Sequence, residues 1–157
     1  MNNRRFGMIA IAGVIMALLF SIANAFVAGP APGKVGLFAV LVGGNEVSGG
    51  AANAGDPDGR GTATVLFPGP GRLCFGLTVA GVNSPTAAHI HRGLPGKNGG
   101  IVVTLTPPAT GNPGSSSRCL SGLNQDLLNE IQAEPGEFYV NIHTRGFPNG
   151  AVRGNLF

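Results

Sequence analysis

Residues 138–156, FYVNIHTRGFPNGAVRGNL, indicate the fold of this 157-residue chain more clearly than the stretches around them. Apolar and polar side chains alternate over 137–145, which is typical of a β-strand with one buried face. A Pro-Asn-Gly turn follows at 148–150, and a second alternating run covers 151–156. The stretch therefore predicts an antiparallel pair of strands at the end of the chain.

The rest of the chain continues this pattern of short apolar runs separated by turns. It contains 27 glycines and 12 prolines, yet 43% of its residues are hydrophobic. Glycines that fall between short apolar runs favour many strands joined by turns. Five further strands are therefore predicted, at 35–42, 62–67, 72–80, 86–92 and 101–106.

One segment has helical spacing instead. Leucine and isoleucine side chains at 123, 127, 128 and 131 predict a short helix over about 124–133, which stops before Pro135 and Gly136. Seven short strands and one helix predict an all-β fold, a Greek-key antiparallel β-sandwich like that of immunoglobulin domains or superoxide dismutase. The segments 44–59 and 107–118 are rich in Gly, Asn, Pro and Ser, and we expect both to be mobile loops.

The first 25 residues have the features of a secretory signal peptide. MNNRR carries Arg4 and Arg5, residues 6–20 are nearly all apolar, and Ala23-Asn24-Ala25 supplies the small residues that a signal peptidase reads. An uncleaved membrane anchor is the alternative, but the apolar run is short for a membrane span. Cleavage after Ala25 would leave a single domain, residues 26–157, in the periplasm or outside the cell.

Charge and cysteine content narrow the range of partners. Without Arg4 and Arg5, eight basic residues face seven acidic ones, and they form no cluster of the kind that binds nucleic acid. We therefore expect no nucleic-acid partner and, after signal cleavage, no membrane association. Cys74 and Cys119 are the only cysteines, and an oxidising compartment makes a disulfide between them the default. Metal-ligating thiolates are less favoured because no C-x-x-C spacing occurs.

Several segments together resemble a known family. GGNEV (43–47) follows the first predicted strand, GRLCFGLTVAGV (71–82) leads into AAHIHRGLPGKNGGIVV (87–103), and FYVNIHTRGFPNGAVRGNL (138–156) closes the chain. The sequence is similar to the CHRD domain, a module of chordin that also stands alone in bacterial secreted proteins. Ser48 stands where the family often has Pro, and Asn155 where Gln is common. The resemblance implies a secreted or periplasmic β-sandwich but implies little about activity.

The three histidines of the chain are the main candidates for a site. His89 and His91 are two residues apart on one predicted strand, so their side chains share a face. On the last two predicted strands, Asn141 and His143 share one face and Arg153 lies on the corresponding face of its own strand. If these strands are neighbours, the histidines and this polar group converge.

Two interpretations of that convergence remain open. In the first, the imidazoles, Asn141 and Arg153 form a supporting hydrogen-bond network, in which the carboxylate of Glu46 compensates the positive charge of Arg153. In the second, His89, His91 and His143 bind a single copper or zinc ion, because neutral imidazole suits both metals and three histidines leave one position open. Cu/Zn superoxide dismutase has a comparable H-x-H pair, which is an analogy of fold alone.

Ordinary enzyme chemistry has little support. The sequence lacks a carboxylate pair, a G-x-S-x-G elbow, an H-E-x-x-H helix and a Walker-type loop. We therefore expect an exported, non-catalytic binding or structural module whose partner is an unidentified protein or extracellular ligand. A copper- or zinc-binding protein, redox-active if the metal is copper, is the alternative.

Overall fold

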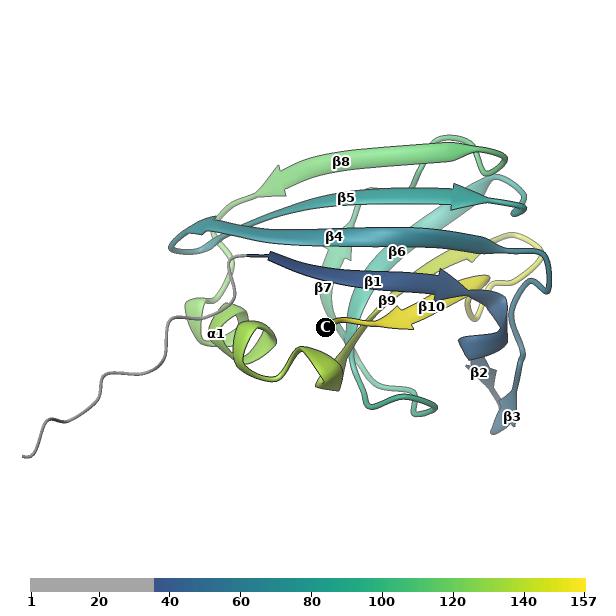
Figure 1. Ribbon diagram of the computed structural model, residues 1–157, viewed down its shortest axis with the longest axis horizontal. Coiled ribbons are helices and arrows are strands. Elements are labelled where there is room, and N and C mark those ends of the chain that lie inside the picture. The colour runs from purple at the N-terminus through teal and green to yellow at the C-terminus, as the bar shows by residue number, and fades with distance from the viewer. Residues whose placement is uncertain (1–35) are drawn as a thin grey trace, which may run out of the picture. The chain divides into compact units, whose positions relative to one another are not determined.

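The computed structural model describes residues 36–157, so the predicted signal peptide and its cleavage site lie outside the described residues. These residues form the fold that the sequence predicts, an antiparallel β architecture with one short helix (Figure 1). No helix among them is long and apolar enough to cross a membrane. Their elements are β1 (Gly36–Val42), η1 (Gly43–Asn45), β2 (Val47–Ser48), β3 (Ala51–Ala52), β4 (Arg60–Gly69), β5 (Arg72–Ala80), β6 (Pro85–Arg92), β7 (Ile101–Leu105), β8 (Gly114–Leu120), α1 (Gln125–Ala133), η2 (Pro135–Glu137), β9 (Phe138–Thr144) and β10 (Val152–Asn155).

Eight strands belong to one sheet that folds over on itself. Their order is β7-β6-β9-β10-β1-β4-β5-β8, and every neighbouring pair is antiparallel. The two predicted layers are thus joined along one side, where β1 meets β10 through the single register pair Val42 and Arg153. The connections from β5 to β6, from β7 to β8 and from β8 to β9 cross between the layers. They make the non-sequential strands β5 and β8, and β6 and β9, hydrogen-bonded neighbours, as a Greek-key arrangement requires.

The core lies between the two layers. Alternate residues of β1 (Leu37, Ala39 and Leu41) are buried, and those between them point outward. One cluster of buried apolar side chains combines β1, β4 and β5 of one layer with β6, β7, β9 and β10 of the other. Helix α1 begins at Asn124, whose side chain accepts hydrogen bonds from the backbone N–H groups of residues 126 and 127. Its buried Leu128 and Ile131 belong to the same cluster, at the end where β1 begins (Figure 1).

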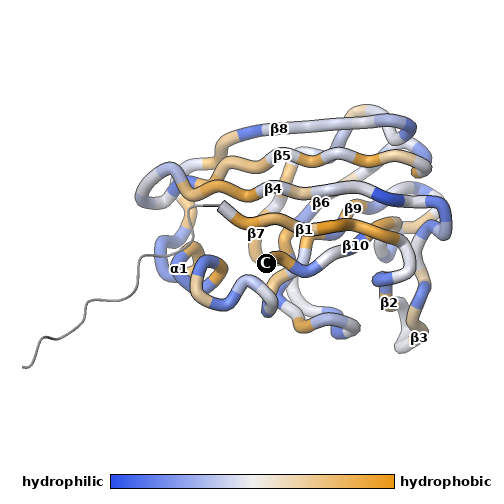
Figure 2. The backbone as a smooth tube through the Cα atoms, in the orientation of Figure 1, coloured by the Kyte–Doolittle hydropathy of each residue, from blue (hydrophilic) through white to orange (hydrophobic). Residues whose placement is uncertain are grey.

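The predicted number of strands, seven, is too low. The sequence predicts a loop over 107–118, but β8 begins at Gly114 and pairs with β5 along its length. Strand β8 has the sequence GSSSRCL and no buried side chain, so it lacks the apolar alternation by which the other strands are recognised. Figure 2 shows the contrast with the hydrophobic β1. The predicted loop 44–59 likewise contains the short β2–β3 hairpin.

The disulfide predicted from the two cysteines is confirmed. Cys74 of β5 and Cys119 of β8 are directly opposite in the antiparallel register, and their sulfurs are bonded. The bond lies on the outward face, because the neighbouring residue Leu73 is in the core. The disulfide therefore attaches the edge strand β8 to the sheet, since β8 has no buried side chain that could do so.

Candidate metal centre

The three histidines lie together on one face of the β6–β9 pair. In the antiparallel register His91 is opposite Tyr139, and His89 is opposite Asn141. His143 lies two residues beyond Asn141 on the same face of β9. The residues between them point into the hydrophobic core, so strand alternation alone brings the histidines to one side of the sheet.

The imidazole nitrogens are close enough to form a compact cluster. One ring nitrogen from each of His89, His91 and His143 lies within 4.8 Å of the other two. Nδ1 of His89 is 3.2 Å from Nε2 of His143. Two nitrogens bound to one zinc ion lie roughly 3.3 Å apart, because each Zn–N bond is about 2.0–2.1 Å long. The widest separation must therefore shorten by rotation of the rings before all three can bind one ion.

Backbone carbonyls set the hydrogen position on two of the rings. Nδ1 of His91 is 2.9 Å from the carbonyl oxygen of Gly99, and Nδ1 of His143 is 2.9 Å from that of Pro148. A carbonyl oxygen only accepts hydrogen bonds, so each Nδ1 carries the hydrogen and donates it. The Nε2 atom of each neutral ring therefore keeps its lone pair, as metal-ligating histidines do.

One of these lone pairs has no partner within residues 36–157. Nε2 of His91 is buried and makes no hydrogen bond. Burial lowers the pKa of His91, and the neighbouring His143 and Arg153 lower it further, against the effect of the Gly99 carbonyl. Burial, followed by the charges of His143 and His91, also lowers the pKa of His89. Both shifts favour the neutral form that binds metal.

Arg153 of β10 is buried between Tyr139 and the loop 93–100, which connects β6 to β7. The residue is 1% exposed, and its guanidinium lies 3.4 Å from the centre of the Tyr139 ring. It donates hydrogen bonds to the side chain of Asn98 at 2.9 Å and to the carbonyl oxygens of Leu94 and Lys97. The sequence predicts that Glu46 compensates the charge of Arg153. The two side chains form no ion pair among the described residues, but their charges interact: burial lowers the pKa of Arg153, while Tyr139 and Glu46 act to raise it.

Glu46 and Asn141 occupy a second buried position beside the histidines. The amide nitrogen of Asn141 is 3.4 Å from a carboxyl oxygen of Glu46, and each residue also has one buried oxygen without a hydrogen-bond partner. Burial raises the pKa of Glu46 to about 7, although Arg153, the backbone of Val47 and Asn141 each act to lower it. The supporting network thus contains a carboxyl group that is neutral in part at physiological pH.

The strand alternation brings His89, His91, His143, Asn141 and Arg153 to one face, as expected for neighbouring strands. Tyr139 is not among the residues predicted from the sequence to take part. Its ring is stacked against His91, and its hydroxyl accepts a hydrogen bond from the backbone of Gly99. The position of Tyr139, on the same strand face as His143, is the sequence signal that could have identified it.

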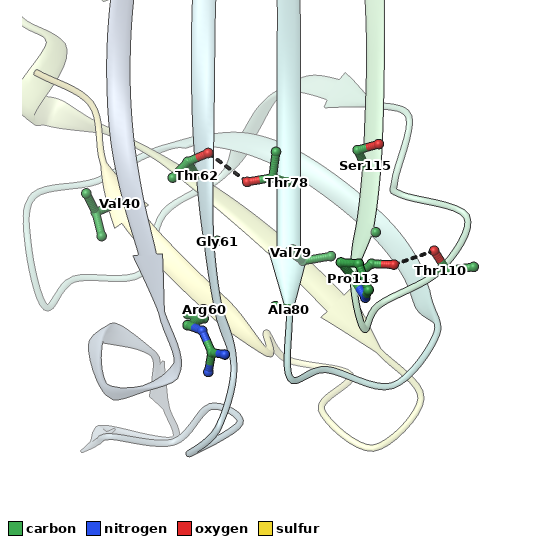
Figure 3. A pocket seen from close by; sticks show the side chains of 11 residues that line it. Val40, Arg60, Gly61, Thr62, Thr78, Val79, Ala80, Thr110, Pro113 and Ser115 are labelled. Atoms are coloured by element: carbon green, nitrogen blue, oxygen red, sulfur yellow. Dashed lines mark hydrogen bonds between the residues drawn. The ribbon is translucent and has the colours of Figure 1, made fainter.

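A separate hollow lies on the layer formed by β1, β4, β5 and β8, whereas the histidines lie on β6 and β9 of the other layer. It has a volume of about 690 Å³ and is lined by β1, β4, β5 and the segment 110–115. Figure 3 shows Thr62 and Thr78 joined by a hydrogen bond of 2.7 Å on its floor, with Val40 and Arg60 beside them. The hollow contains no group of metal-ligating side chains among the described residues.

The chain also matches a known family over most of its length. The family model of the CHRD domain matches residues 37–156, which include every strand of the sheet except the first residue of β1. No curated protein matches the chain. The match covers the strands that carry all three histidines and the disulfide, in agreement with the resemblance of the AHIHRG and VNIHT segments. The chain belongs to the CHRD domain family.

Proposed function

We propose that this protein is an exported binding module that holds one copper or zinc ion on His89, His91 and His143. The buried, unpartnered Nε2 of His91 carries the proposal. A buried polar atom without a partner is unfavourable, whereas a metal ion at this atom would use its lone pair. The neighbouring rings supply two more nitrogens within 4.8 Å.

The chemistry of the ligands favours copper or zinc over harder cations. Imidazole nitrogen suits copper and zinc, and calcium and magnesium prefer oxygen ligands. Three protein ligands leave one coordination position free for water or for an atom of a partner molecule. The disulfide supports export, because such bonds persist mainly in oxidising compartments.

A purely structural network is the second candidate, and one observation favours it. Nδ1 of His89 and Nε2 of His143 are already hydrogen-bonded at 3.2 Å, so two of the three rings satisfy each other. Nε2 of His143 accepts in this pair, since its Nδ1 donates to Pro148. His89 therefore donates from Nδ1, and this hydrogen must move before Nδ1 can bind metal.

Metal content decides between the two candidates. The protein is purified without a polyhistidine tag from the compartment in which it accumulates, and copper and zinc are measured before and after titration with each ion. We expect one equivalent of metal, and for Cu(II) a nitrogen hyperfine pattern from three imidazoles. His91→Ala should abolish this signal, whereas Thr64→Ala on the exposed outer layer should not.

Absence of uptake in the unaltered protein at tens of micromolar copper or zinc would refute the metal site. A lowered melting temperature in His91→Ala would then assign the histidines to the scaffold.

A further inference from the structure

The loop 93–100 lies against His91 and Tyr139, and the buried side chain of Arg153 binds it at three residues. The guanidinium of Arg153 donates to the side chain of Asn98 and to the backbone carbonyl oxygens of Leu94 and Lys97. These acceptors lie at both ends of a four-residue turn closed by the hydrogen bond from Lys97 N–H to the Leu94 carbonyl. One planar cation thus ties three residues of the loop together, while Asn155 donates to the carbonyl oxygen of Gly93 and Asn98 to that of Val47.

The same loop supplies the acceptor that orients His91. Gly99 follows Asn98 directly, and its carbonyl oxygen accepts from Nδ1 of His91 at 2.9 Å. Its N–H donates to the hydroxyl of Tyr139 at 3.3 Å. A side chain at this position would place its Cβ 1.5 Å from the carbonyl oxygen of Arg92, so only glycine fits this close approach of the two backbone segments. Gly99 is therefore held through both its N–H and its carbonyl group.

A stack of three flat groups completes the connection. The Arg153 guanidinium lies 3.4 Å from the centre of the Tyr139 ring, and the His91 ring is parallel to Tyr139 with a centroid distance of 4.8 Å and an interplanar angle of 7°. Tyr139 thus lies between the cation and the imidazole. Arg153 acts on His91 by two routes, through the loop to its Nδ1 and through the stack to its ring plane.

We infer that Arg153 is a positioning residue for the metal ligand His91, because it fixes the loop whose Gly99 carbonyl holds Nδ1–H and leaves Nε2 free to bind. The inference rests on the proposed metal-binding function. Without the Gly99 acceptor the hydrogen would exchange between Nδ1 and Nε2, and the population with a free Nε2 would fall. Partners of this kind typically change metal affinity by about 10–100-fold.

Lysine cannot replace arginine in this role. The guanidinium donates to three acceptors in different directions while its flat face lies on Tyr139, and an ammonium group offers neither the plane nor the fork. Arg92 provides a matched control. Its guanidinium also lies over an aromatic ring, at 4.8 Å from the centre of Phe138, but this guanidinium pairs with Glu130 and makes no hydrogen bond to the loop.

The test compares Arg153→Lys with Arg92→Lys by ¹⁵N NMR of the histidine side chains and by Cu(II) titration. We expect Arg153→Lys to shift His91 from the pure Nδ1–H form to a mixture of tautomers. We expect its copper affinity to fall about 10–100-fold, with loss of one imidazole from the hyperfine pattern. Arg92→Lys should retain the tautomer, the affinity and the three-nitrogen pattern.

Two results would overturn the inference. One is an Arg153→Lys protein with an unchanged His91 tautomer and copper affinity. The other applies if Arg153→Lys does not fold. Gly99→Ala displaces the loop segment that accepts from Nδ1 of His91 while Arg153 stays, and an unchanged His91 tautomer and copper affinity in that variant would exclude positioning through the loop. If the unaltered protein binds no metal, the proposed function fails by itself, and the His91 tautomer in Arg153→Lys still shows whether Arg153 orients that ring.

Discussion

The ring of His91 lies flat against the ring of Tyr139, with an interplanar angle of 7°. The two residues are opposite each other on β6 and β9, so their stacking follows from the antiparallel register. Tyr139 is 2% exposed, and its hydroxyl accepts a hydrogen bond from Gly99. The stack joins the histidine face to the loop 93–100 beside it.

Substitution at Tyr139 separates the two parts of this contact. Tyr139→Phe keeps the stack and removes the acceptor for the Gly99 N–H, so we expect a loss of about 1 kcal/mol in the free energy of unfolding. Tyr139→Leu also removes the aromatic face under Arg153 and His91, and we expect a loss of about 2–4 kcal/mol. Urea unfolding of both variants checks the order. Equal losses would show that the ring stack contributes nothing measurable.

The strands that carry the histidines could be predicted from the sequence because each has a buried face that alternates with a polar one. This alternation also assigns His89, His91, His143 and Arg153 to the same side once β6, β9 and β10 are neighbours. The sequence gives no such signal for β8, whose small polar residues contact the sheet through the backbone and the disulfide.

The hydrogen-bond partners of the histidines could not be predicted in the same way. Gly99 and Pro148 act through backbone carbonyl oxygens, which every residue possesses, so residue type does not mark them. The partners of Arg153 depend on the conformation of the loop 93–100. Sequence favours a carboxylate for a buried arginine, whereas the structure uses two carbonyls, an amide and an aromatic ring.

Glu46 makes the stability of the fold depend on pH. Its pKa is raised to about 7 from 4.5, chiefly by burial, so the folded state binds the proton more tightly than the unfolded chain. This contribution favours the folded state below about pH 4.5, and it is lost as the pH rises to about 7. Glu46→Gln removes the ionisation, and we expect it to stabilise the protein at pH 8 by up to about 3 kcal/mol.

Unfolding free energies of Glu46→Gln and the unaltered protein at pH 5 and pH 8 provide the measurement. The difference between the two proteins should grow with pH over this interval. A constant difference would show that Glu46 keeps its ordinary pKa in the folded state.

The disulfide should matter most for β8. Chain entropy gives about 4 kcal/mol for a crosslink between residues 45 apart in sequence. Strand β8 has no buried side chain, so its amide hydrogens should exchange with solvent much faster in Cys74→Ser/Cys119→Ser. The amide hydrogens of β9, in the other layer, should still exchange only when the whole protein unfolds. Hydrogen exchange followed by mass spectrometry resolves the two segments. Uniform acceleration in both would indicate a global loss of stability alone.

Alanine substitutions at the adjacent residues Gly99 and Gly100 should have different effects, because only Gly99 lies close to another backbone segment. A Cβ at residue 99 would lie 1.5 Å from the carbonyl oxygen of Arg92, whereas one at residue 100 would meet no atom within 4 Å. Gly99→Ala must therefore displace the loop segment whose carbonyl holds Nδ1 of His91, and Gly100→Ala leaves it in place.

We expect Gly99→Ala to unfold at lower denaturant concentration and to bind copper at least 10-fold more weakly, since partners of a ligating histidine have effects of about this size. Gly100→Ala should match the unaltered protein in both measurements. Titration with Cu(II) at pH 7.5, alongside urea unfolding of each apoprotein, provides the comparison. If Gly99→Ala lowers stability but leaves copper affinity unchanged, the Gly99 carbonyl anchors the loop without orienting the ligand.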